Sequence, residues 1–125
     1  MDLALWIIQV VLALAFLAFG ASHVFRFDDL AARPRTVWVQ TVGKANLRVI
    51  GVLEILGAIG LVLPAATGIL PWLTPLAAAM LALLMVFAIA FHARRPGEAQ
   101  NIVLNVVLGV LLLAVAWGRF VAEPF

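Results

Sequence analysis

The sequence predicts an all-α fold, a transmembrane four-helix bundle, and two observations lead to it. Of the 125 residues, 66% are hydrophobic and only 11% are charged, and the mean hydropathy is +1.20. A water-soluble domain is about half apolar and about a quarter charged, so this chain has too few polar groups to cover its surface in water. Its apolar residues also fall into four long runs separated by shorter linking segments.

Each apolar run has the length and pattern of a membrane-spanning helix. A crossing takes about 20 residues, whereas barrel strands are shorter and alternate polar with apolar residues, which these runs do not. A helix also pairs its own backbone polar groups, as lipid requires. We therefore expect one membrane domain over residues 1–125, with helices at about 3–21, 46–63, 72–92 and 101–118.

Prolines and glycines mark the expected breaks between these helices. Pro64 is expected to end the second helix, and the neutral link of residues 64–71, which contains Gly68, is typical of a tight turn. Pro34 interrupts the long first connection, where Trp38 and its apolar neighbours favour a short segment at the membrane interface. The first run has Asp2 and no basic residue before it, so we expect a retained span rather than a signal peptide.

Basic residues are distributed unequally between the connections, which predicts an orientation. Arg94 and Arg95 lie in the third connection, and the second has no basic residue. The first connection is the most basic, with Arg26, Arg33, Arg35, Lys44 and Arg48. Because Lys and Arg favour cytoplasmic loops, we expect both basic connections in the cytoplasm and both termini outside.

Polar residues within the apolar runs are candidates for function because they are costly in a bilayer. Glu54 shares its helix face with the small residues Gly51, Gly57 and Ala58, at offsets of three and four. Small residues let a second helix approach closely, so Glu54 is predicted to point into the bundle. There its carboxyl group could act as an acid or base.

Several polar residues lie at similar depths on different helices. We expect a ligand-binding pocket at the basic side, floored by Phe and Leu and lined by His23, Glu54, His92, Asn101 and Asn105. On the first helix, Gln9 and His23 lie on one stripe together with Ala13, Phe16 and Gly20. The opposite half of the bundle is expected to be an apolar scaffold.

Each of these residues also has a purely structural interpretation. Glu54 could pair with Arg48, Lys44 or another basic residue near the interface and fasten the helices together. Asn101 could be the N-cap of the fourth helix, and Asn105 could make a hydrogen bond between helices. The histidines could simply be solvated. Two histidines without a third ligand do not predict a metal site.

Several segments resemble the DoxX-like family of membrane proteins. KANLRVIGVLEILGAIGLVLP (residues 44–64) resembles the second helix of that family, and FGASH (residues 19–23) resembles the end of the first. FH (residues 91–92) and NIVLN (residues 101–105) are similar to parts of the third and fourth helices. The resemblance implies a four-helix bundle in a bacterial inner membrane. It also implies an association with quinone or thiol redox systems, often beside a separate catalytic subunit.

Three functions follow as hypotheses. The first is a non-catalytic component that binds a quinone-like lipophile or a membrane or peripheral redox partner; the chain has no cysteine for thiol chemistry of its own. The second is a small enzyme, an isomerase or hydrolase of a lipophilic substrate, with Glu54 as acid or base. The third is a proton-coupled transporter, although small multidrug exporters carry their membrane carboxylate in the first helix.

The expected surroundings are the lipid bilayer and, as an open alternative, further copies of the chain. Gly51, Gly57 and Gly60 could serve packing within one bundle or between copies. A nucleic-acid partner is not expected, because no basic run is interleaved with aromatic residues.

Overall fold

The computed structural model describes residues 1–125 and contains helices only. Four helices are long and apolar enough to cross a membrane: α1 (Asp2–Phe25), α4 (Lys44–Thr67), α5 (Leu73–Ala93) and α6 (Ala99–Trp117), the last extended by the π-helix η2 (Gly118–Ala122). The predicted all-α transmembrane bundle is therefore confirmed. The helices extend somewhat beyond most of the predicted bounds, because their first and last turns include polar residues that the apolar runs leave out.

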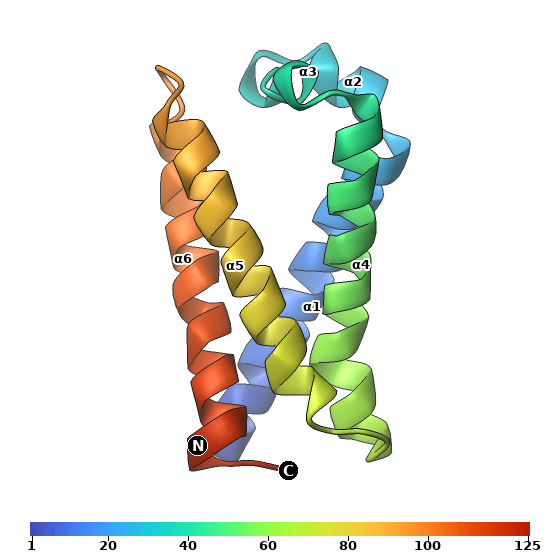
Figure 1. Ribbon diagram of the computed structural model, residues 1–125, viewed down its shortest axis with the longest axis vertical. Coiled ribbons are helices and arrows are strands. Elements are labelled where there is room, and N and C mark those ends of the chain that lie inside the picture. The colour runs from blue at the N-terminus through green and yellow to red at the C-terminus, as the bar shows by residue number, and fades with distance from the viewer.

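The helices form two antiparallel pairs (Figure 1). α1 packs along α4, α5 packs along α6, and α4 contacts α5. The pairs lie close together where the two termini lie and diverge toward the other end, which carries the short elements α2 (Phe27–Ala31), η1 (Pro34–Thr36) and α3 (Val39–Val42). We call this second end the basic end, because it holds both basic connections. The expected break at Pro34 is confirmed, since η1 begins at this residue.

The core is apolar and is shared by all four long helices. Its members include Leu12 and Phe16 of α1, Leu61 of α4, Leu81 of α5 and Leu112 of α6, all of them almost completely buried. Many large apolar side chains instead face outward, which suits a surface in contact with lipid.

Glycines in α4 are used for packing inside the bundle. A Cβ atom at Gly51 would lie 2.7 Å from the carbonyl oxygen of Gly20, so the backbones of α1 and α4 touch here. Gly57 lies against Leu81, and a Cβ atom at Gly60 would lie 2.8 Å from the Cβ of Ala77. These three glycines therefore serve contacts between helices of one chain.

The prediction that α4 ends at Pro64 is wrong. The helix continues through this proline to Thr67 and ends at Gly68, whose φ of 72° is the left-handed conformation that glycine adopts easily. Pro64 therefore lies within the last turns of α4, where only a short stretch of helix follows it.

Neighbouring helices compensate for Pro64. Proline has no N–H group, so the carbonyl four residues earlier, that of Gly60, loses its usual partner. The Thr74 hydroxyl of α5 donates a hydrogen bond to this carbonyl at 2.9 Å. The Gln9 amide of α1 donates to the next carbonyl, that of Leu61, at 2.8 Å. The Thr74 hydroxyl thus replaces the missing donor, and the Gln9 amide adds a further bond from α1 to the same part of α4.

The expectation of an apolar scaffold at the end opposite the basic end is also wrong. Arg119, in η2, is only 3% exposed there. Its guanidinium donates hydrogen bonds to Gln9 Oε1 at 2.7 Å and to Asp2 Oδ1 at 2.6 Å, and it lies 4.2 Å from the ring centroid of Phe125. The charge is tolerated because its donors are paired and its face covers an aromatic ring.

Candidate functional site

A cavity of about 650 Å³ lies at the basic end, between the two diverging helix pairs. The residues predicted as ligand contacts all line it, namely His23, Glu54, His92, Asn101 and Asn105. The structure thus brings together side chains from α1, α4, α5 and α6 on one cavity. Their role in binding a ligand stays a prediction.

The polar wall on the α1–α4 side is a pair formed by His23 and Glu54. His23 Nδ1 lies 2.5 Å from Glu54 Oε1, and Glu54 is only 3% exposed. The close approach of α1 and α4 at Gly51, one turn before Glu54, holds the two side chains within hydrogen-bond distance. Imidazole and carboxylate can therefore share or exchange a proton at the cavity surface.

Glu54 pairs with neither Arg48 nor Lys44, but its pair with His23 joins α1 to α4, so a structural role for Glu54 stays open. Arg48 Nε lies 3.5 Å from the carbonyl oxygen of Val24, and Lys44 Nζ lies 3.7 Å from Asp28 Oδ2. Both basic side chains therefore contact other residues, whereas Glu54 faces His23 of α1.

A second polar group borders the cavity on the α5–α6 side. His92 Nδ1 lies 2.5 Å from Glu98 Oε1, and Arg95 Nε donates to Glu98 Oε2 at 2.5 Å. Arg95 also donates to Thr41 Oγ1 at 2.6 Å, which links the α5–α6 connection to the segment just before α4. His92 is thus a buried, paired residue rather than a solvated one.

Trp38 lies between the two histidines. Its ring centroid is 5.9 Å from that of His23 and 4.9 Å from that of His92, with the rings nearly perpendicular in both cases. This residue was predicted to lie at the interface, but no local sequence pattern indicates that it borders the cavity. Ser22, Thr36 and Gln100 were also missed, since only the tertiary fold brings them to the cavity.

Glu98 gives the basic end a predictable response to pH. Burial opposes its charged form, but hydrogen bonds from Arg95 and His92 outweigh this and hold the pKa of Glu98 below its ordinary value of 4.5. A pKa lowered by folding stabilises the protein above the unfolded pKa, and the effect is lost as pH falls through the folded pKa.

We expect Glu98→Gln to reduce the acid sensitivity of folding. Between about pH 6 and about pH 3, the free energy of unfolding of the unchanged protein should fall more steeply than that of the variant. Denaturant titrations of both proteins in the same detergent measure the difference. If the free energy of unfolding fell equally steeply with decreasing pH in both proteins, the Glu98 pairs would not contribute to the acid sensitivity of folding.

The two asparagines of α6 do not have the structural roles considered for them. Glu98, not Asn101, is the N-cap of α6, and the Asn101 backbone N–H donates to the Glu98 carbonyl at 3.1 Å. Asn105 makes none of the side-chain hydrogen bonds between helices, which run instead through Gln9, Glu54, Thr74 and Arg119. It is only 9% exposed, and it lines the cavity.

The rest of the cavity wall is mostly apolar. Phe16 and Phe19 of α1 line it together with Met85 of α5 and Leu104 and Leu108 of α6. Such an apolar chamber with a few convergent polar groups is typical of sites for small lipophilic molecules, which range from about 300 to 1,000 Å³.

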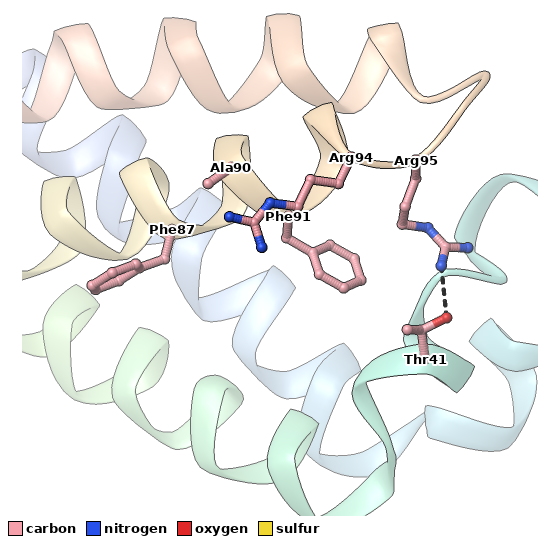
Figure 2. A pocket seen from close by; sticks show the side chains of 6 residues that line it. All are labelled: Thr41, Phe87, Ala90, Phe91, Arg94 and Arg95. Carbon is pink, nitrogen blue, oxygen red and sulfur yellow. Dashed lines mark hydrogen bonds between the residues drawn. The ribbon is translucent and has the colours of Figure 1, made fainter.

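A smaller groove of about 430 Å³ lies beside this cavity, along α5 (Figure 2). Phe87 and Phe91 line both spaces. The other residues of the groove are Thr41, Ala90, Arg94 and Arg95. We call it the Arg94 groove.

Four apolar helices around a mostly apolar cavity with a few polar side chains define the chain as a multi-pass membrane protein of the four-helix class. The DoxX-like family matches residues 7–115. The match covers most of the chain, so the chain belongs to the DoxX-like family, as the helix motifs predicted. No curated protein and no solved structure matches it.

Proposed function

We propose that this DoxX-like protein binds a quinone-like lipophile in the cavity at its basic end and presents it to a redox partner in a bacterial inner membrane. The observation that carries the proposal is Asn105. Asn105 is 9% exposed as a residue, lines the mostly apolar cavity and makes no side-chain hydrogen bond within the chain. No fully buried side-chain nitrogen or oxygen of the chain lacks a partner, so the unbonded Asn105 amide is accessible from the cavity, where it can bond a ligand carbonyl.

The chemistry of the walls matches a molecule with two oxygens and an apolar body. Asn105 can donate an N–H to one carbonyl oxygen. The His23–Glu54 pair comes from the other helix pair and can donate to a second oxygen. Phe16, Met85 and Leu108 offer an apolar surface for a ring and the start of its tail.

A partner for electron transfer fits the composition of the chain. Without cysteine, the protein has no thiol to reduce or oxidise a bound quinone. The electrons would come from a separate subunit, which would meet the ligand at the basic end. In our proposal this end faces the cytoplasm, because it carries both basic connections.

Trp38 provides a test of quinone binding. It is the one tryptophan at the basic end; the others are Trp6, Trp72 and Trp117. In a variant with these three changed to Phe, a short-chain ubiquinone should quench Trp38 fluorescence in a saturable way. Adding Asn105→Leu should weaken the binding roughly tenfold, which is the effect of losing one buried hydrogen bond.

Two controls separate binding from simple partitioning of quinone into detergent. Asn46→Leu makes the same chemical change outside the cavity, where Asn46 bonds the Val42 carbonyl, and should leave the affinity unchanged. A variant that keeps only Trp117 should show quenching without saturation. The proposal would be contradicted if quenching of Trp38 rose linearly with quinone concentration without saturating. It would also be contradicted if Asn105→Leu left the affinity for quinone unchanged.

A small acid–base enzyme is the second candidate, and the 2.5 Å contact between His23 and Glu54 favours it. Such a pair could remove a proton next to the carbonyl of a lipophilic ketone. In D₂O the protein should then speed deuterium exchange into geranylacetone, and Glu54→Gln should slow this exchange by about 100-fold or more. If deuterium exchange into geranylacetone were no faster with the protein than without it, the enzyme hypothesis would be eliminated.

A further inference from the structure

The Arg94 groove contains a cation that the chain itself does not neutralise. Arg95 pairs with Glu98, and Arg26 and Arg33 both pair with Asp29. Arg94 takes part in none of the ion pairs of the chain, which use the carboxylates of Asp2, Asp28, Asp29, Glu54 and Glu98. The groove therefore holds one guanidinium whose charge and N–H donors are available to another molecule.

The exposed side chain of Arg94 runs along α5 (Figure 2). Arg94 follows α5 by one residue, and its side chain lies back along the helix beside Ala90 and Phe91 (Figure 2). Ala90 and Phe87 precede it by four and seven residues, so the charge lies over the same helix face as an apolar strip that reaches into the membrane-spanning segment.

Arg94 is exposed and has no carboxylate partner, so its charge can attract an anion from outside the chain. The molecule that can pair it must be anionic at one end and apolar at the other, because the groove has Arg94 at its entrance and Phe87, Ala90 and Phe91 along its length. We propose that the Arg94 groove binds an anionic phospholipid such as phosphatidylglycerol. The guanidinium binds the phosphate oxygens, and an acyl chain lies on the phenylalanine rings.

Arginine suits this role because its planar fork binds two phosphate oxygens at once. Basic pockets between transmembrane helices are known as binding places for anionic lipid headgroups. Arg95 lies in the same groove, but its hydrogen bonds to Glu98 and Thr41 occupy it, so Arg94 is the specific contact. The lipid would also touch Phe87 and Phe91, which line the main cavity on their other side.

The proposal is tested directly by measuring which lipid the purified protein retains. The protein is purified in detergent with equimolar phosphatidylglycerol and phosphatidylcholine, and retained lipids are counted by native mass spectrometry. We expect phosphatidylglycerol to be preferred, and Arg94→Gln to reduce this preference about five-fold. Ala90→Phe, which fills the groove without changing charge, should reduce the retained phosphatidylglycerol as well.

Arg48→Gln is the matched control. It removes the same charge at the same end of the bundle, from a residue that also lacks a carboxylate partner but lies outside the groove. We expect it to retain the selectivity for phosphatidylglycerol. Equal losses in Arg48→Gln and Arg94→Gln would mean diffuse attraction to the surface and would overturn the proposal. Displacement of the lipid by millimolar inorganic phosphate would also overturn it, because the site would then bind free anions without the acyl chain.

Discussion

Replacing Gly51 by alanine is expected to lower the free energy of unfolding by about 2 kcal/mol. The added Cβ would lie 2.7 Å from the Gly20 carbonyl oxygen and 3.0 Å from the Cβ of His23. Backbone atoms cannot move aside without separating α1 from α4. The same separation would pull His23 away from Glu54, so the variant should also bind quinone more weakly. Chemical unfolding in detergent and Trp38 quenching measure the two effects.

Gly109→Ala is the control for this change. It lies within α6, and a Cβ there would be 3.6 Å from the Cβ of Met85, an ordinary contact. Because alanine favours a helix over glycine, this variant should be as stable as the unchanged protein or more stable by up to about 1 kcal/mol. If both glycines tolerated alanine equally, the close contact between α1 and α4 would be refuted.

Replacing Arg119 by leucine should cost about 3 kcal/mol of folding free energy. The change leaves the oxygen of the Gln9 side chain without its donor in a fully buried position. It also removes the contacts that join η2 to Asp2 of α1 and to the ring of Phe125. The free energy of unfolding in the same detergent measures the loss.

Arg33→Leu provides the comparison for Arg119. Arg33 is exposed and pairs with Asp29, which still has Arg26 as a second partner. A surface pair of this kind contributes less than about 1 kcal/mol, so this variant should remain nearly as stable as the unchanged protein. A similar loss in both variants would show that burial of Arg119 is not what makes it important.

Much of the fold could be predicted because lipid imposes simple rules on a sequence. Long apolar runs identified the helices, and the small residues around Glu54 correctly indicated a face directed into the bundle. The same local reasoning failed at Pro64, because the partners that keep α4 intact there come from α1 and α5. The local sequence pattern does not show which residues of other helices will contact a given position.

The candidate site was predicted in part for a similar reason. The distance of each residue from the basic end of its helix can be counted from the sequence, so polar residues within about two turns of that end could be grouped on one cavity. Partners could not be assigned, because they depend on helix rotation and on the path of the first connection. That path places Trp38 between His23 and His92. It also places Thr41 beside Arg95. Arg119 was overlooked because Gln9, its buried partner, lies at the other end of the sequence.

Photolabelling tests most directly whether a lipophile occupies the cavity. A quinone with a diazirine on its ring would be irradiated with the purified protein, and the modified residues would be located by mass spectrometry. We expect labels on the cavity-facing residues Phe16, Met85 and Leu108, with loss of these labels when unlabelled quinone is in excess. Labels confined to outward-facing residues such as Leu83 and Val103, without competition, would contradict the proposed binding site.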